Sequence, residues 1–487
     1  MVSDERRLAY GVLLAQFPGT TVPTWLDEPL RNGLAGIILF GENTPDVETT
    51  RGVVSTFQAV RRAAGGPSLI VASDEEGGDV TRLQVGTGSS LPGNAALGDV
   101  DDVDLTQRCA TAFGQLLAYA GITYDLAPCL DVASEPLNPV IGVRSFGADP
   151  SLVARHGAAF ATGLRAAGVH SCGKHFPGHG ATSVDSHLTL PVLDVSLEVL
   201  AVRDEAPFAC GVDSVMTAHV VVPALGPDPA TLSAWATRRA RALGITGPII
   251  TDALGMRAVA DMYEMREAAV RALEARADLL CLDAPTGRDP QRDFESAVAG
   301  IEAGLASGRL SAEALTRSYE RNLALTGTPL PTASLAEILT DLDAVGAEAA
   351  TRAVRTGGSV RCDGPVVVAD LRHRVSIAAG NAPLALATAL EARGALARVD
   401  RDVASAVAAL EPLVAVVREP LADAIEGSML AELLRARPDT VVVHTGLASA
   451  APHAQRIVYA HGAGRVNAEA VAALLVEGVT RSAPNSV

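Results

Sequence analysis

The feature that most restricts the fold is a repeated strand-then-helix pattern that runs to residue 282. Each unit starts with a short run of apolar, β-prone residues and continues into a segment rich in Ala, Leu, Arg and Glu. The eight runs lie at residues 13–17, 35–40, 69–73, 123–127, 169–173, 214–218, 248–251 and 278–282. Eight such units predict a (β/α)8 barrel, and several runs are apolar on both faces, as buried parallel strands should be. The first unit is ambiguous, because residues 8–16 fit a helix equally well.

The composition changes after Leu325. Residues 326–332 contain two prolines and no periodicity, which indicates a linker, and residues 335–355 are expected to form a helix. Further short β runs then alternate with helical stretches, at residues 366–369, 375–378, 397–399, 413–417, 440–444 and 456–460, before a last helix at 468–475. We therefore expect a barrel at residues 1–335, followed at 336–487 by a linker helix and a smaller αβα domain with a doubly wound sheet. Its Gly462-Ala463-Gly464 is interpreted as a turn, and a lone Gly pair is weak support for phosphate binding.

Composition narrows the possible partners. The net charge of −17 is spread along all 487 residues, which argues against binding to nucleic acid or to anionic membranes. Only 3% of residues are aromatic, so a small substrate in a pocket is favoured over a long polymer. The six cysteines form no Cys-x-x-Cys pair and no disulfide framework. The apolar run at residues 8–15 is short and has no cleavage site after it, and no run approaches the ~20 apolar residues of a membrane span, so we expect a cytoplasmic protein.

One loop concentrates chemically active side chains. Between residues 174 and 187 the chain carries one lysine, three histidines and an aspartate, directly after a predicted strand. Catalytic groups of a (β/α)8 barrel lie at the carboxyl ends of its strands. The other predicted strand ends also carry polar side chains, namely Asp74, Asp131 with Arg144, His219, Asp252 and Asp283. For any one of them the alternative is a residue that caps the next helix, and for Asp283 that alternative is favoured.

Asp252 and His187 suggest a reaction. Cleavage of a glycosidic bond with retention needs a carboxylate nucleophile and an acid that protonates the leaving oxygen. Asp252 follows a buried strand, where a carboxylate is costly unless it is paired or used. An imidazole serves as the acid because its pKa of roughly 6.5 lies near neutral pH, and Asp185 would orient the ring of His187 and stabilise its charged form.

A second set of side chains suits sugar hydroxyl groups. These groups accept hydrogen bonds from Lys and Arg and donate them to Asp. The set consists of Asp74, Arg144, Lys174 and His175, extended by Glu76 and Arg82. Gly77 and Gly78 predict a tight turn, and Glu75 and Asp79 are expected to be solvated.

These motifs together resemble glycoside hydrolase family 3, of the bacterial β-N-acetylglucosaminidase type. The most specific stretch is Lys174-His175-Phe176-Pro177-Gly178-His179-Gly180 followed by Asp185-Ser186-His187, and residues 74–82, 127–132, 138–147, 215–219 and 251–256 also match in family order. The resemblance implies Asp252 as nucleophile and His187 as general acid/base with Asp185. It implies sugar binding by Asp74, Arg82, Arg144, Lys174 and His175, and a C-terminal domain without catalytic residues. The chain departs from the family at Asp79, where a basic residue is common, and at Ala253 and Gly255 beside the nucleophile.

Several alternatives stay open. A neutral histidine base does not repel a phosphate dianion, so a β-N-acetylglucosaminide or β-glucoside phosphorylase is the closest alternative to a hydrolase. A metal hydrolase is less favoured: its candidate ligands His170, Cys172, His175, His179 and His187 match no zinc spacing, and Lys174 would repel a cation. A non-catalytic sugar-binding protein would lack the nucleophile or the acid, whereas Asp252, His187 and Asp185 are all present in this sequence. A Ser-His-Asp hydrolase is disfavoured, because the sequence lacks the Gly-x-Ser-x-Gly turn that carries its serine. We expect a small sugar or glycoconjugate substrate, no metal and no cofactor; the aglycone and the oligomeric state stay open.

Overall fold

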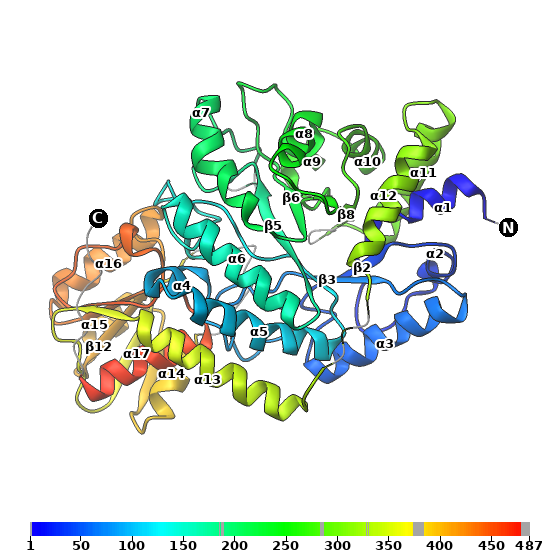
Figure 1. Ribbon diagram of the computed structural model, residues 1–487. Coiled ribbons are helices and arrows are strands. Elements are labelled where there is room, and N and C mark those ends of the chain that lie inside the picture. Colours follow the sequence, from blue (N-terminus) through cyan, green and yellow to red (C-terminus); the bar gives the residue numbers. More distant parts are fainter. Residues whose placement is uncertain are drawn as a thin grey trace.

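The structure is a computed structural model that describes residues 2–184, 186, 189–282, 287–327, 329, 331–373 and 384–478. It contains a barrel and a smaller second domain, which lies to one side of the barrel in orange, yellow and red (Figure 1). Among the described residues, no helix combines the length and the apolar character needed to cross a bilayer.

Eight parallel strands form the barrel. They are β1 Leu13–Ala15, β2 Gly36–Leu39, β3 Ile70–Ser73, β4 Tyr124–Asp125, β5 His170–Phe176, β6 Ser214–Thr217, β7 Ile249–Thr251 and β8 Leu280–Leu282. The hydrogen-bonded order is β7-β6-β5-β4-β3-β2-β1-β8, and a parallel bridge between Ile250 and Leu279 brings the two ends together. The predicted (β/α)8 barrel is confirmed. The ambiguous first unit contains both elements, because a helix ends at Tyr10 and β1 begins at Leu13.

Helices surround the strands and begin at polar caps. They are α1 Asp4–Tyr10, α2 Asp27–Arg31, α3 Val47–Ala63, α4 Asn94–Val100, α5 Val103–Ala120, α6 Pro150–Ala166, α7 Leu197–Val199, α8 Ala234–Ala242, α9 Arg257–Ala260, α10 Met265–Glu274, α11 Pro290–Ala306 and α12 Ala312–Asn322. Asp46, Asp102 and Asp149 each accept a backbone N–H at the start of α3, α5 and α6. These caps satisfy amide groups that have no partner inside the helix.

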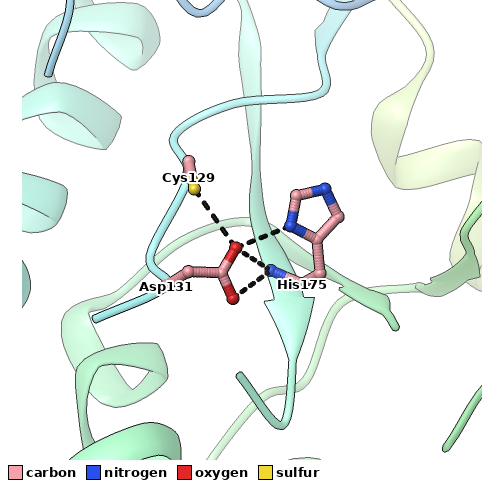
Figure 2. Close-up of side chains that lie close together, drawn as sticks. All are labelled: Cys129, Asp131 and His175. Carbon is pink, nitrogen blue, oxygen red and sulfur yellow. Dashed lines mark hydrogen bonds and ion pairs between the residues drawn. The ribbon is translucent and has the colours of Figure 1, made fainter. Parts of the chain in front are cut away.

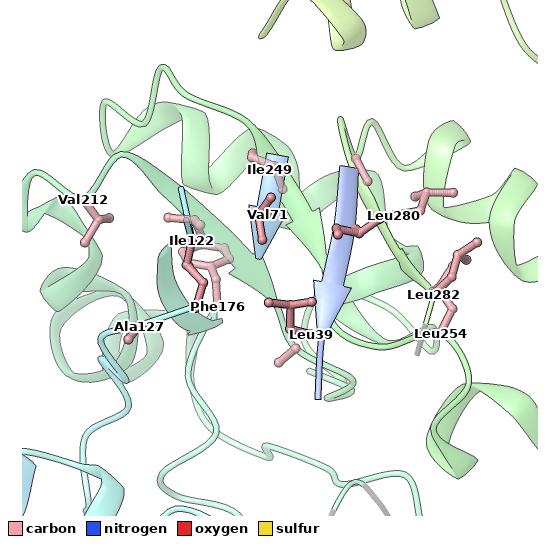
Figure 3. Packing of buried hydrophobic residues seen from close by; sticks show 14 of the residues in the cluster. Leu39, Val71, Ile122, Ala127, Phe176, Val212, Ile249, Leu254, Leu280 and Leu282 are labelled. Atoms are coloured by element: carbon pink, nitrogen blue, oxygen red, sulfur yellow. The ribbon is translucent and has the colours of Figure 1, made fainter. Parts of the chain in front are cut away.

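Alternate strand residues supply two separate cores. Leu13 and Ala15 of β1 and Leu39 of β2 pack in the layer between strands and helices, part of which is drawn in Figure 3. Leu14 and Ile38, one position away, belong to a second cluster that also contains Tyr124, Met216 and Ile250. Because successive strand side chains point to opposite faces, this second cluster fills the barrel interior. The strands are therefore buried on both faces.

The second domain is an αβα sandwich, as predicted. Its strands are β9 Arg355–Gly357, β10 Val366–Asp370, β11 Ala397–Asp400, β12 Leu413–Val417, β13 Val441–His444 and β14 Ile457–Tyr459, and its helices are α13 Leu335–Ala353, α14 Ala385–Glu391, α15 Val403–Ala408, α16 Ala424–Ala436 and α17 Arg465–Glu477. The strand order is β11-β10-β12-β13-β14-β9, parallel except for β9. One face of the sheet packs on α14 and α17 and the other on α15 and α16. The strand predicted at 375–378 lies outside the described residues.

Two details differ from the sequence-based expectation. The helix predicted at 335–355 ends at Ala353, because Arg355 already pairs with Tyr459 in an antiparallel edge strand. In the barrel, β5 continues to Phe176, three residues beyond the predicted end, so Lys174 and His175 lie within the strand. The domain boundary at residue 335 stays a prediction; α13 begins there and packs against both α5 and α17 (Figure 1).

Candidate active site

The carboxyl ends of the barrel strands bring most of the expected polar residues together. Asp74 follows β3, Asp131 lies in the segment after β4, and Lys174 and His175 are near the end of β5. His219 lies two residues after the end of β6, and Asp252 comes directly after β7. Asp185, His187 and Asp283 lie outside the described residues. Ser186 is described, and its Oγ lies 3.1 Å from Nε2 of His179.

Three buried ionic side chains and one that is partly buried form what we call the charged cluster: Glu76, Arg144 and Lys174, with Asp74 as the partly buried member. Lys174 Nζ lies 2.6 Å from both Asp74 Oδ1 and Glu76 Oε1. Arg144 binds the carboxylate of Glu76 in bidentate fashion, with Nε 2.9 Å from Oε2 and Nη2 2.8 Å from Oε1. Outside the cluster, Arg82 Nη2 lies 3.7 Å from Asp74 Oδ2. Charges this deeply buried require such pairing to offset the loss of hydration.

The pairing keeps all four groups ionised. Burial alone would raise the pKa of Glu76, but the charges of Arg144 and Lys174 hold it well below its ordinary value. Lys174 and Arg82 overcome burial in the same way and lower the pKa of Asp74. Burial would lower the pKa of Lys174 and of Arg144, yet the neighbouring carboxylates raise both. The cluster therefore presents fixed charges to a ligand at neutral pH.

Asp131 extends the cluster through His175 (Figure 2). Its Oδ2 lies 2.6 Å from Nδ1 of His175, and it also accepts the backbone N–H groups of His175 and His179. Burial opposes ionisation, but the neighbouring His175 outweighs it and lowers the pKa of Asp131 to about 2. Nη2 of Arg144 lies 3.3 Å from Nε2 of His175, and because Arg only donates, Nε2 is the acceptor and Nδ1 carries the proton. Asp131 thus fixes the tautomer of His175.

The loop at residues 174–187, which we call the histidine-rich loop, is anchored to the barrel through its described residues His179 to Thr182. Nδ1 of His179 lies 2.7 Å from Thr182 Oγ1, and Asn138 Nδ2 donates to the carbonyl groups of both residues. Gly180 packs so closely that an added Cβ would lie 1.9 Å from the carbonyl oxygen of Val132. Burial lowers the pKa of His179 to about 4, so this ring is neutral at pH 7. Its role is structural, because it holds the loop through hydrogen bonds.

Asp252 is half-buried after β7. Its backbone N–H donates to Thr217 O over 3.1 Å, and its Oδ1 accepts the N–H of Ala253 over 2.8 Å. His219 lies behind this segment, with Nε2 2.8 Å from the carbonyl oxygen of Ala253. His219 therefore holds the backbone that carries Asp252.

One group of potential metal ligands occurs among the described residues: Cys129, Asp131 and His175 (Figure 2). Of the metal ligands that the sequence suggested, only His175 belongs to this group. Cys129 Sγ donates to Asp131 Oδ2 over 3.2 Å, and burial together with the charge of Asp131 raises the pKa of this thiol far above its ordinary value. A protonated thiol is a poor metal ligand, and Arg144 beside His175 would repel a cation. The three side chains fit their observed hydrogen bonds better than a metal ion.

The expectation that Glu75 and Asp79 are solvated is wrong. Glu75 is fully buried and accepts hydrogen bonds from Thr81 Oγ1 and from the backbone N–H groups of Arg82 and Leu83. Burial raises the pKa of Glu75 to about 7. Asp79 is buried against the second domain. Glu75 thus shapes the loop that carries Arg82, a role that its neighbours in the sequence do not reveal.

Comparisons with known proteins agree with this architecture. Residues 21–325 match the model of the glycosyl hydrolase family 3 N terminal domain. The chain is 35% identical over 347 residues to beta-hexosaminidase A of Pseudoalteromonas piscicida, which covers 65% of this chain and 57% of that relative. It is 37% identical over 309 residues to beta-hexosaminidase LpqI of Mycobacterium tuberculosis, covering 60% and 76%. The chain thus spans under two thirds of the first relative and about three quarters of the second.

Among solved structures, a glycoside hydrolase family 3 beta-N-acetylglucosaminidase from Paenibacillus sp. str. FPU-7 superposes with a TM-score of 0.88 at 29% identity. The superposition covers 99% of this chain and 98% of that one, so both domains are included.

Proposed function

Because the chain belongs to glycoside hydrolase family 3, we propose that it is a retaining exo-β-N-acetylglucosaminidase that removes terminal β-linked N-acetylglucosamine. The observation that carries the proposal is the charged cluster at the barrel mouth, together with Asp252 at the carboxyl end of β7. The names of the hexosaminidase relatives and of the Paenibacillus enzyme support the choice of sugar.

The proposed reaction is a double displacement. His187 protonates the leaving oxygen while an oxygen of Asp252 bonds to the anomeric carbon, which breaks the glycosidic bond and leaves a glycosyl ester. The imidazole, now neutral, takes a proton from water, and that water attacks the anomeric carbon and releases Asp252. Asp185 would orient His187 and stabilise its charged form. The half-buried position of Asp252 at the end of β7 suits a nucleophile.

The sugar hydroxyl groups would be bound by Asp74, Arg82, Arg144, Lys174 and His175. An ammonium has three N–H donors, and Lys174 Nζ contacts two carboxylates, those of Asp74 and Glu76. Carboxylates and cations held in place in this way can bind the two hydroxyl groups of a vicinal diol in bidentate fashion. Since their geometry is set before the sugar arrives, little ordering cost is incurred on binding.

The test compares aryl β-N-acetylglucosaminide with aryl β-glucoside, each with and without millimolar phosphate. Hydrolysis of the first and little reaction with the second is expected. Acceleration by phosphate with release of a sugar 1-phosphate would make phosphate the acceptor and refute the hydrolase. A cell-wall muropeptide and a chitin disaccharide, tested in the same way, would identify the aglycone, and preference for the muropeptide would support a place in cell-wall recycling.

A further inference from the structure

The C-terminal domain touches the barrel at the turn that carries Glu76. We propose that Asp79 is a positioning residue: the second domain holds its carboxylate, and the turn at residues 76–80 transmits this hold to Glu76 and the charged cluster. The proposal rests on the proposed function of that cluster as the sugar site. It gives the C-terminal domain a part in sugar binding even though it supplies no side chain to the cluster.

Asp79 bonds two parts of the second domain that meet at the carboxyl ends of its strands. The backbone N–H of Ala463 donates to Asp79 Oδ1 over 2.7 Å, and Nη2 of Arg418 lies 3.6 Å from Oδ2. Ala463 precedes the thirteen-residue helix α17, and Arg418 follows β12. Both the helix N-terminus and the guanidinium favour a negative charge. The carboxylate of Asp79 therefore fills the anion position that the Gly462-Ala463-Gly464 turn offers.

The backbones of the two domains also approach closely at this point. A Cβ on Gly464 would lie 3.2 Å from the carbonyl oxygen of Gly78 across the interface. Within the barrel, a Cβ on Gly78 would lie 2.9 Å from the carbonyl oxygen of Pro92. Gly78 has a φ of +59°, so glycine is required there on both counts. The cavity left between the domains measures about 10 Å³ and is lined by residues that include Glu76, Arg144 and His461. That volume holds about one water molecule at most, so the turn has little room to move.

The turn itself is stiff enough to transmit the contact. The N–H groups of Glu76 and Gly77 both donate to Val80 O, over 3.1 and 3.0 Å, and Val80 N–H donates back to Gly77 O over 3.1 Å. Asp79 at the tip and Glu76 at the base are thus parts of one hydrogen-bonded unit. A displacement of Asp79 would shift Glu76 relative to Arg144 and Lys174, and misplacement by about 1 Å is enough to weaken a preorganised site severely.

The nature of the side chain at position 79 matters for this contact. A basic residue at position 79 would face Arg418 and accept no hydrogen bond from Ala463. An alanine removes the contact, and an asparagine keeps an oxygen acceptor for the N–H of Ala463 while losing the charge. These two variants separate the hydrogen bond from the ion pair.

The first experiment measures kcat and KM for aryl β-N-acetylglucosaminide in the full chain. Asp79→Ala should lower kcat/KM about tenfold, within the range of ordinary coupling between sites, with the rise in KM as the larger part. Asp79→Asn should restore most of the loss, and Arg418→Ala should add little in the Asp79→Ala background because both act through one contact. The control is Arg352→Ala, which breaks an exposed 2.8 Å ion pair between α13 and Asp102 and should leave kcat/KM unchanged.

The second experiment uses hydrogen exchange of the amides at 461–466, with and without saturating N-acetylglucosamine. Coupling is reciprocal, so the sugar should slow exchange at Ala463 in the wild type and should not do so in Asp79→Ala. The proposal would be overturned if kcat/KM is unchanged in Asp79→Ala. It would also be overturned if bound sugar does not change the exchange rates of these amides in the wild type. A wild type that neither cleaves the aryl glycoside nor binds N-acetylglucosamine would overturn the proposed function itself, and this inference with it.

Discussion

Replacing Glu76 with glutamine tests the charge balance of the site directly. Glu76 accepts two hydrogen bonds from Arg144 and one charged contact from Lys174, all between 2.6 and 2.9 Å. Glu76→Gln preserves the size of the side chain and removes its charge. Arg144 then faces an amide that has one acceptor in place of two, and Lys174 keeps Asp74 as its anionic partner.

The size of the effect follows from burial. Side chains of Arg144 and Glu76 are 6% and 2% exposed, and removing one partner of a buried ion pair costs about 3–5 kcal/mol. Arg108 and Glu348 provide a control on the surface, because they also form a bidentate pair, through Nη1 and Nη2 at 3.0 and 2.9 Å. Glu348→Gln should cost about 0.2–1 kcal/mol, the usual range for exposed pairs. The comparison separates the effect of burial from that of bidentate pairing.

Urea-induced unfolding of the full chain at pH 7 measures both costs, and KM for the aryl glycoside reports on the sugar site. We expect a loss of unfolding free energy several times larger for Glu76→Gln than for Glu348→Gln, with a raised KM only in the first. Equal losses for the two variants would refute the reasoning, because they would mean that the cluster is not held together by buried charge.

Three further predictions concern the reaction and its charges. Asp252→Ala should abolish turnover, whereas His187→Ala should spare aryl glycosides with good leaving groups far more than natural glycosides; equal loss on both would contradict the acid role. Asp131, whose folded pKa is about 2 against an ordinary value of 3.8, should contribute on the order of 2 kcal/mol of stability above pH 3.8 that is lost as the pH falls toward 2. Asp131→Asn should remove that dependence in acid-unfolding curves. Aryl β-glucuronide should be a poor substrate, because the three cations Arg82, Arg144 and Lys174 are already paired with the carboxylates of Asp74 and Glu76. Ready cleavage would contradict this charge balance.

The fold was largely predictable because its strands are buried on both faces. A parallel strand covered on both sides is typically an apolar run of a few residues, which the sequence displays directly. All eight barrel strands overlap the predicted runs, although β4 and β5 also carry polar residues. The edge strand β9 was missed for the converse reason. Arg355, Thr356 and Gly357 show no apolar alternation, and they form a strand because β14 offers them hydrogen-bonding partners.

Part of the candidate site could also be predicted, since barrel topology dictates where the strand ends meet. Asp74, Arg144, Lys174 and His175 were expected there and do lie together. The burial of Asp79 was not predictable, because its partner Ala463 is 384 residues away in the chain. Solvation was the natural expectation for a carboxylate in a Gly-rich turn, and only the packing of the second domain reverses it.

Glu76 is the member of the charged cluster whose position depends on the second domain. Attraction between the paired charges offsets the cost of removing them from water. The electrostatic energy of the cluster therefore depends steeply on the distances among Glu76, Arg144 and Lys174. Such a cluster needs a rigid support, and two of its members have one in the barrel: Lys174 lies in β5, and Asn94 Nδ2 donates to the carbonyl oxygen of Arg144 over 2.7 Å. Glu76 is on a turn outside the strands, and the support on its far side is the second domain, through Asp79. A barrel that binds sugar through this turn therefore has a physical reason to keep its C-terminal neighbour.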